Sequence, residues 1–119
     1  MVFDVTEENF QAEVMESELP VLIDFWADWC GPCHRLAPVF EEVSEKYEGR
    51  VRFARVDTTA QKGLRIKFAI GVLPTLTLCR GEKIIDIADQ LVPAEELERR
   101  LDIALTGALD DQLCRKLIG

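Results

Sequence analysis

Residues 21–27 (Val-Leu-Ile-Asp-Phe-Trp-Ala) form an almost continuous apolar run, and this run most constrains how the chain can fold. It is too short for a typical helix, and it would place apolar side chains on both faces of a strand. A strand of this kind is typical of a parallel sheet that helices cover on both sides. The run therefore predicts an α/β fold. Asp24 is its one charged residue.

The segments around this run alternate between the patterns of strands and helices. The expected strands are 3–5, 21–27, 51–56, 75–79 and 83–87, the last two joined as an antiparallel hairpin by the turn 80–82. The first two expected helices run from Thr6 to before Leu19 and from Pro32 to before Gly49, the second with a kink at Pro38. A third helix would follow the third strand and end at Phe68, and a fourth would begin at Pro93. This order predicts a mixed sheet with helices on both faces.

The length and composition of the chain indicate a single domain. It has 119 residues, of which 48% are hydrophobic, and this is enough for one ordinary core. We expect the domain to span residues 1–106. Residues 107–119 would add a short C-terminal helix, because Leu109, Leu113 and Leu117 are spaced four apart, and a frayed tail is the alternative.

Two further features bear on location and partners. Residues 1–10 lack the basic start of a secretory signal, and no stretch approaches the roughly 20 apolar residues of a membrane span, so the default location is the cytoplasm. With 22 acidic and 14 basic side chains, the formal net charge is −8. That charge would repel phosphate backbones and anionic lipids, which argues against nucleic acid and membranes as partners.

Cys30 and Cys33 form a C-x-x-C pair shortly after the apolar run. This spacing serves as half of a zinc site, as a structural disulfide, or as a dithiol that cycles between reduced and oxidised states. A cytoplasmic protein does not need a structural disulfide. A closed zinc site needs four ligands, and beyond this pair the chain offers only isolated His34, Cys79 and Cys114. We therefore expect no metal site and favour a redox dithiol.

The position of the two cysteines predicts their roles. Cys30 falls at the start of a helix, where unpaired backbone N–H groups favour a thiolate, so it is the expected nucleophile. Cys33 lies one turn further in and is the expected resolving thiol, shielded but close enough to attack a mixed disulfide at Cys30. Gly31 would let the backbone turn tightly, and Pro32 would start the helix and stiffen the loop. Both residues are expected to tune the reduction of the pair.

Four other residues near or outside this motif have competing interpretations. A buried Asp24 would be protonated or would accept a proton, and we expect it to assist Cys33 as a general acid and base, the alternative being a cap on a neighbouring backbone group. We expect His34 to be a solvated helix residue, the alternatives being a metal ligand and a modulator of the thiol pKa. Cys79 would be a small buried hydrophobe, and Cys114 a spectator thiol.

Residues 24–33 (Asp-Phe-Trp-Ala-Asp-Trp-Cys-Gly-Pro-Cys) resemble the active-site run of the thioredoxin family almost residue for residue. The resemblance extends from about residue 3 to about 105 and includes Pro38, Val56-Asp57 and residues 72–75. It implies the thioredoxin fold, a central mixed five-stranded sheet flanked by helices on both faces. It also implies a protein-disulfide reductase, a monomer that binds no cofactor and whose Cys30–Cys33 disulfide is redox-active. Its partners would be disulfide-containing substrate proteins and a flavin-containing thioredoxin reductase that passes on electrons from NADPH.

The resemblance also implies a substrate-binding surface beside the dithiol. The family's matching proline is cis, whereas from sequence alone Pro74 could equally be a trans turn residue. The backbone of Leu73 would pair with the substrate chain. Trp29, Pro32, Val72 and Leu73 would form an apolar docking surface, while we expect Trp26 to pack in the core.

Several departures from the family pattern bear on partner choice and reduction potential. His34 and Arg55 each stand where a lysine is common, residues 88–90 replace the usual Val-Gly, and the hairpin turn is one residue short. The rival enzyme on the same scaffold is an oxidase or isomerase, and the reduction potential decides between them. The rival from another class is a binding module in which the dithiol is incidental.

Overall fold

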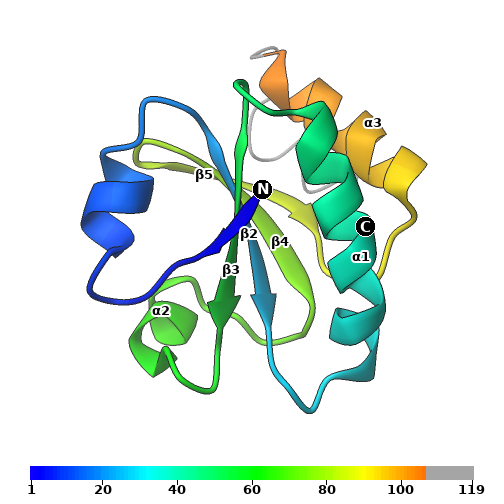
Figure 1. Cartoon of the computed structure of the whole chain (residues 1–119). Helices are drawn as coiled ribbons and strands as arrows, with labels where there is room; N and C mark the ends of the chain where they lie inside the picture. Colours follow the sequence, from blue (N-terminus) through cyan, green and yellow to red (C-terminus); the bar gives the residue numbers. More distant parts are fainter. Residues whose placement is uncertain (107–119) are drawn as a thin grey trace.

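Strand β2 (Val21–Trp26) lies in the middle of a five-stranded sheet, as its two apolar faces require (Figure 1). The computed structural model describes residues 1–106. The sheet order is β1-β3-β2-β4-β5, in which the other strands are β1 (Val2–Asp4), β3 (Arg52–Asp57), β4 (Thr75–Arg80) and β5 (Lys83–Ala88). Strands β1, β3 and β2 run parallel, whereas β4 is antiparallel to both of its neighbours. The predicted mixed five-stranded sheet is confirmed.

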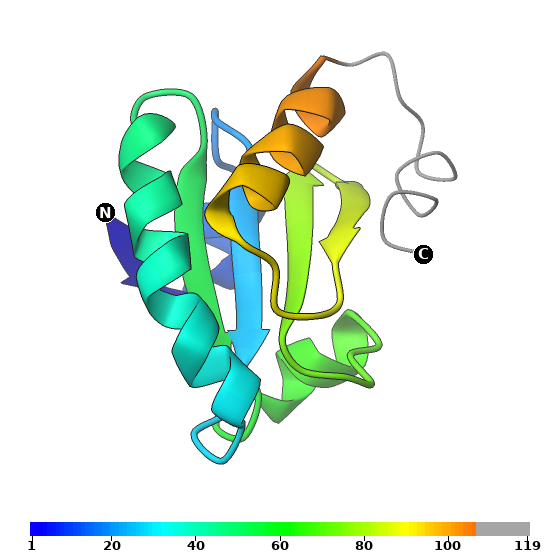
Figure 2. The ribbon, with the colours of Figure 1, turned by 90° about the vertical axis from the view of Figure 1, so that its right-hand side faces the viewer.

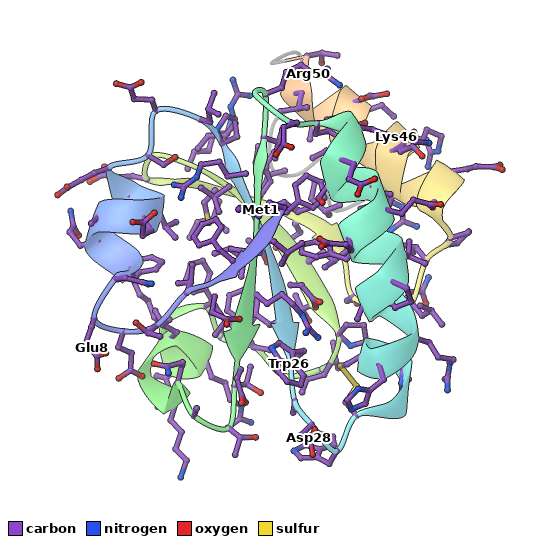
Figure 3. The ribbon with its side chains drawn as sticks, viewed as in Figure 1. Met1, Glu8, Trp26, Asp28, Lys46 and Arg50 are labelled. Atoms are coloured by element: carbon purple, nitrogen blue, oxygen red, sulfur yellow. A yellow bond between two sulfur atoms is a disulfide. The ribbon has the colours of Figure 1, made fainter. Side chains whose placement is uncertain are left out.

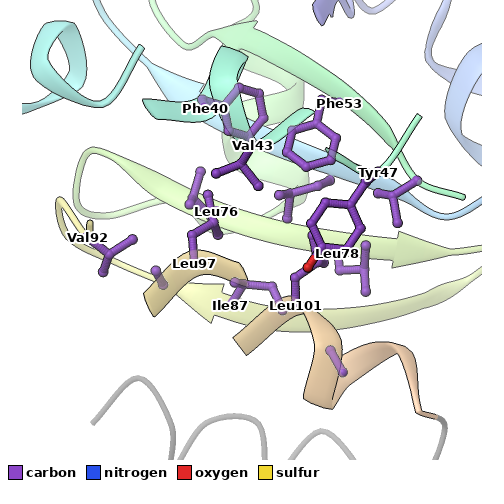
Figure 4. Close-up of a cluster of buried hydrophobic side chains, with 14 of the residues drawn as sticks. Phe40, Val43, Tyr47, Phe53, Leu76, Leu78, Ile87, Val92, Leu97 and Leu101 are labelled. Carbon is purple, nitrogen blue, oxygen red and sulfur yellow. The ribbon is translucent and has the colours of Figure 1, made fainter. Parts of the chain in front are cut away.

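Helices α1 (Gly31–Lys46) and α3 (Ala94–Leu105) cover one face of the sheet (Figure 2). They close over a hydrophobic cluster in which Phe40 of α1 stacks against Phe53 of β3 with ring centroids 4.9 Å apart (Figure 4). Leu78 and Leu101 complete this layer from β4 and α3, and both are fully buried. Burial of such side chains stabilises the fold by roughly 1.5–3 kcal/mol each.

The opposite face of the sheet is covered by two short helices, η1 (Gln11–Met15) and α2 (Lys62–Lys67) (Figure 1). Val14 of η1 and Leu64 of α2 pack in a second hydrophobic cluster with Ile23 and Phe25 of β2. Successive residues of β2 thus face alternate layers. Asp24 lies between Ile23 and Phe25, so its side chain belongs to the α1 side.

The first predicted helix is shorter than expected. The Thr6 hydroxyl accepts a hydrogen bond from the Asn9 N–H at 3.2 Å, and the Asn9 side-chain oxygen accepts one from the Thr6 N–H at 2.7 Å. This reciprocal pair resembles a capping box, with Thr6 as the cap, and the regular helical segment that follows it is only the π-helical η1. Phe10 and Val14 are nevertheless both buried, as their spacing indicated.

Four other predictions concern the helix after β3, the hairpin, Pro38 and the C-terminal segment. The helix after β3 begins only at Lys62, because the Asp57 carboxylate accepts the Thr59 N–H at 2.9 Å and holds a turn there. The hairpin strands are longer than predicted, so the turn is reduced to Gly81-Glu82, with Gly81 at φ 63°. Pro38 lies inside α1, and a kink there stays a prediction. The predicted C-terminal helix at 107–119 lies outside the described residues.

The topology brings distant segments to one edge of the sheet. The parallel strands β2 and β3 both end at this edge, and the antiparallel β4 begins there. The chain after β2 leads into α1, and Thr58, which follows β3, donates from its N–H to the Trp26 carbonyl at 2.9 Å. No helix within residues 1–106 has the length and apolarity needed to cross a membrane.

Candidate active site

Cys30 and Cys33 are joined by a disulfide at the first turn of α1, with their Cα atoms 5.3 Å apart. The bond is drawn in yellow in Figure 3, at the start of α1 near the labelled Trp26. Cys30 is the N-cap residue, and its sulfur accepts a hydrogen bond from the Cys33 N–H at 3.2 Å. Cys30 is 5% exposed and Cys33 is 0% exposed. Cys30 is therefore the more exposed of the two cysteines, as predicted, although both are largely buried.

The loop before Cys30 is held by the first turn of α1. The Cys30 N–H donates to the Ala27 carbonyl at 3.1 Å. The His34 Nε2 lies 2.6 Å from the Asp28 carbonyl oxygen, so this nitrogen carries the proton that makes the bond. His34 is exposed, as expected of a solvated helix residue, but it also ties the helix to the loop. Its ring meets that of Trp26 edge to face at 6.2 Å.

Asp24 lies fully buried in β2. Its Oδ2 accepts a hydrogen bond from the Arg55 Nε at 3.3 Å, and within residues 1–106 its Oδ1 has no partner. Burial raises the pKa of Asp24 from 3.8 to about 6, and the Arg55 guanidinium limits that rise by favouring the carboxylate. Among the described residues, the carboxylate thus pairs with a side chain and caps no backbone group. A group with this pKa can both hold and release a proton near neutral pH.

Arg55 lies beside Asp24 because strands β2 and β3 pair in register, with Asp24 opposite Arg55. Its guanidinium also stacks over the Trp26 ring, 4.1 Å from the ring centroid. Trp26 is half-buried and joins neither of the two hydrophobic clusters, so the expectation of core packing is wrong in detail. It lies between Arg55 and His34, and its indole nitrogen is buried without a partner within residues 1–106.

The segment before β4 presents apolar side chains at the same edge. The Leu73–Pro74 peptide bond is cis. Val72 is 54% exposed and Leu73 is partly buried, whereas Pro74 itself is buried. Thr75 donates from its hydroxyl to the Val72 carbonyl at 2.7 Å and so holds the bend. Within residues 1–106, the N–H and the carbonyl oxygen of Leu73 form no hydrogen bond.

Comparison with known protein families identifies the family to which the chain belongs. The family model described as Thioredoxin matches residues 1–102. The chain belongs to the thioredoxin family. Thioredoxin 1 of Nostoc sp. is 38% identical to it over 98 residues, which make up 82% of this chain and 92% of that protein. Thioredoxin of Synechocystis sp. is 39% identical with the same coverage, and thioredoxin C-2 of Corynebacterium nephridii is 38% identical over 85% of this chain and 94% of that protein.

Membership of the thioredoxin family confirms several of the predictions. The fold is the thioredoxin fold, and the redox-active disulfide is the Cys30–Cys33 bond. The protein is a thiol–disulfide oxidoreductase, and its activity is the reduction of disulfides in other proteins by dithiol–disulfide exchange. The individual roles of the site residues stay predictions.

The remaining residues singled out in the sequence, inside and outside the motif, have simpler environments. Gly31 is the first residue of α1, and an added Cβ there would meet nothing closer than the Arg35 Nη1 at 3.7 Å, so the turn does not require glycine. Pro32 occupies the first turn of α1, where its missing N–H costs nothing. Cys79 is a buried free thiol in β4, as predicted. Cys114 lies outside the described residues.

Sequence reasoning missed a pocket beside the thioredoxin motif. The pocket has a volume of about 320 Å³ and is lined by Trp29, Thr58, Thr59, Lys62, Arg65, Ile70, Gly71 and Leu73. The signal that could have revealed it is topological, because the ends of parallel β2 and β3 must lie side by side. Within residues 1–106, no group of three or more His, Cys, Asp or Glu side chains could hold a metal ion.

Proposed function

We propose that Cys30 is the nucleophile and Cys33 the resolving thiol of this protein-disulfide reductase. The Cys30 thiolate attacks one sulfur of a substrate disulfide, forming a mixed disulfide and releasing the other substrate sulfur as a thiolate. Cys33 then attacks the Cys30 sulfur, which restores the Cys30–Cys33 bond and frees the second substrate thiol. Two electrons pass from the dithiol to the substrate, and the observed disulfide is the oxidised form of this cycle.

The contact that best supports these roles is the hydrogen bond from the Cys33 N–H to the Cys30 sulfur at 3.2 Å. A donor at a helix N-terminus favours the thiolate over the thiol, which lowers the pKa of a cysteine in that position. Cys33 has no comparable access, because it is 0% exposed against 5% for Cys30. An incoming substrate sulfur therefore meets Cys30 first.

Asp24 acts in this proposal as the proton acceptor for Cys33. Its side chain lies on the α1 side of the sheet, the side from which Cys33 projects inward, and its pKa of about 6 lies between those of an ordinary carboxyl and a thiol. Its Oδ1 has no partner within residues 1–106 and is free to take a proton. Deprotonating a fully buried Cys33 would otherwise leave the charge without a solvent acceptor.

Trp29, Pro32, Val72 and Leu73 form the proposed docking surface for substrate proteins, and the buried Pro74 would contribute to substrate binding by fixing the backbone after Leu73. Trp29 is 75% exposed and Val72 54% exposed, and large apolar side chains left in water are typical of interaction sites. The free N–H and carbonyl oxygen of Leu73 would pair with an extended substrate segment. Gly31 and Pro32 would set the reduction potential through the conformation of the loop between the thiols.

The wider setting of the reaction is also part of the proposal. A thioredoxin reductase that carries flavin would reduce the Cys30–Cys33 disulfide with electrons from NADPH. We place the protein in the cytoplasm, because a reducing compartment keeps such a dithiol in its reduced form. It would act as a monomer, with residues 1–106 as the catalytic domain and 107–119 as an extension.

An insulin-reduction assay with dithiothreitol tests the proposal. Wild type should accelerate precipitation of the insulin B chain, whereas Cys30→Ser should leave the rate at that of dithiothreitol alone. Cys79→Ser is the matched control, because it removes a buried thiol in β4 and should keep full activity. Wild-type activity no higher than that of Cys30→Ser would refute the proposed role of Cys30.

Rapid-mixing kinetics test the separate role of Asp24. Asp24→Asn should slow the resolution of the mixed disulfide by Cys33 more than its formation at Cys30. Equal slowing of both steps would remove the proposed proton transfer. The binding-module alternative predicts that a Cys30→Ser, Cys33→Ser double variant keeps full function in its host, and the oxidase alternative predicts a much less negative reduction potential than a reductase has.

A further inference from the structure

The charge of this acidic protein is distributed unevenly along the chain. Residues 58–81 contain four of the 14 Lys and Arg side chains and none of the 22 Asp and Glu side chains. Three of the four cations, Lys62, Arg65 and Lys67, lie on α2. Helix α2 lies at the lower left of the sheet in Figure 1, close to the edge where β2 and β3 end. A basic surface therefore adjoins the redox site of a chain whose net charge is −8.

Two of these cations line the pocket of about 320 Å³ described above. Lys62 and Arg65 form its basic part, whereas Trp29, Ile70 and Leu73 provide apolar wall. Trp29 immediately precedes the nucleophile Cys30, and Leu73 carries the free backbone groups proposed for substrate pairing. A substrate chain held at Leu73 would therefore have neighbouring side chains within reach of this pocket.

Within residues 1–106, neither Lys62 nor Arg65 forms an ion pair. Glu7 and Asp57 bind backbone N–H groups beside or in the pocket lining rather than these two cations. Glu7 accepts the Gly63 N–H at 2.6 Å, and Asp57 accepts the Thr59 N–H at 2.9 Å.

We propose that this basic pocket binds a glutamate or aspartate side chain of the substrate protein, close in sequence to the disulfide that is reduced. The apolar walls would cover the methylene groups of that side chain, and Lys62 and Arg65 would bind its carboxylate. The proposal rests on the proposed reductase function and adds a preference among substrates. It also gives an acidic substrate one favourable orientation on a protein whose net charge otherwise repels it.

Synthetic peptides with a single disulfide test this preference. In each pair the peptides differ only in one residue, Glu or Gln, placed in turn at the three positions on either side of the reactive cysteine. For at least one position, wild type should reduce the Glu peptide with a kcat/KM about twofold to fivefold higher, as expected for exposed ion pairs. Lys62→Gln/Arg65→Gln should abolish this preference and leave the rate with the Gln peptide unchanged, which also shows that the variant is folded.

The matched control is Arg80→Gln/Lys83→Gln, which makes the same change in net charge. Both residues flank the Gly81-Glu82 turn, at the end of β4 opposite to Thr75 and the redox site. This control should keep the wild-type preference for Glu. The proposal is overturned if wild type shows no preference at any position, or if the control loses the preference as fully as the pocket variant. Reduction of the Gln peptides in those cases would leave the reductase function intact, whereas no reduction of any peptide would refute both.

Discussion

Replacement of Asp24 by Asn should stabilise the folded protein, and the gain should depend on pH in a defined way. Asp24 is fully buried, and burial raises its pKa from 3.8 to about 6 despite the opposing effect of Arg55. The unfolded chain therefore releases this proton at lower pH than the folded chain. As pH rises from about 4 to 6, the folded state loses stability relative to the unfolded state, and above pH 6 it carries the full cost of the buried charge.

The size of this cost follows from the two pKa values. A difference between 3.8 and about 6 corresponds to about 3 kcal/mol, since one pKa unit equals about 1.36 kcal/mol. Asp24→Asn keeps the shape of the side chain and removes the ionisation. The free energy of unfolding of the variant minus that of wild type should therefore be about 3 kcal/mol larger at pH 8 than at pH 3.5, so the variant is relatively more stable at pH 8. Any fixed effect of the amide on packing or on Arg55 is the same at both pH values and cancels in this comparison.

Urea denaturation of the oxidised proteins at several pH values measures this difference. The oxidised state is used because the Cys30–Cys33 disulfide then removes both active-site thiols from the titration. Asp89→Asn is the control, because Asp89 is exposed and its replacement should give no such pH dependence. A difference between Asp24→Asn and wild type that is constant from pH 3.5 to 8, or that reverses in favour of wild type as pH rises, would refute the reasoning.

Three further predictions concern single residues. His34→Ala should lower the free energy of unfolding of the oxidised protein by about 0.5–1.5 kcal/mol, since it removes the bond to the Asp28 carbonyl, and His34→Gln should recover most of the loss in urea denaturation. Burial raises the pKa of Cys79 to about 12. In the reduced folded protein, iodoacetamide should therefore label Cys30 at least about 100-fold faster than Cys79, as followed by mass spectrometry. Equal labelling of the two cysteines would contradict this. Ala69 ends α2 with φ 54°, so Ala69→Gly should stabilise the fold by about 0.5–1 kcal/mol in urea denaturation, and a loss of stability would contradict the backbone argument.

The elements around the redox motif were predictable because their signals are local. The apolar run of β2 and the start of α1 at the C-x-x-C pair both follow from short-range patterns of burial and from the position of Pro32. Helix α2 begins later than predicted because of a local polar side chain, since the Asp57 carboxylate accepts the Thr59 N–H and holds a turn there. Thr6 and Asn9 accept bonds from each other's backbone N–H groups, and only the π-helical η1 follows where a longer helix was expected.

The other end of helix α2 lies where the sequence predicted it, at Phe68. Its last turn is closed by bonds from the Ala69 N–H to the Ile66 carbonyl and from the Ile70 N–H to the Arg65 carbonyl, each at 3.0 Å. This arrangement ordinarily ends on glycine, because the residue after the cap takes a positive φ. Ala69 occupies that position instead, and α2 still ends at its C-cap Phe68, where the sequence predicted the helix to end.

By itself the sequence determined the order of strands and helices, the family, and the placement of Cys30 ahead of Cys33 at a helix start. Only the tertiary structure decided which residues surround that dithiol. Arg55 reaches Asp24 because β2 and β3 pair in one register, and Trp29, Lys62 and Leu73 line one pocket because two parallel strands end where an antiparallel strand begins. The spacing of apolar residues indicates which face of each segment is buried. The contacts at the site join residues far apart in the chain, and they depend on how the strands are aligned in the sheet.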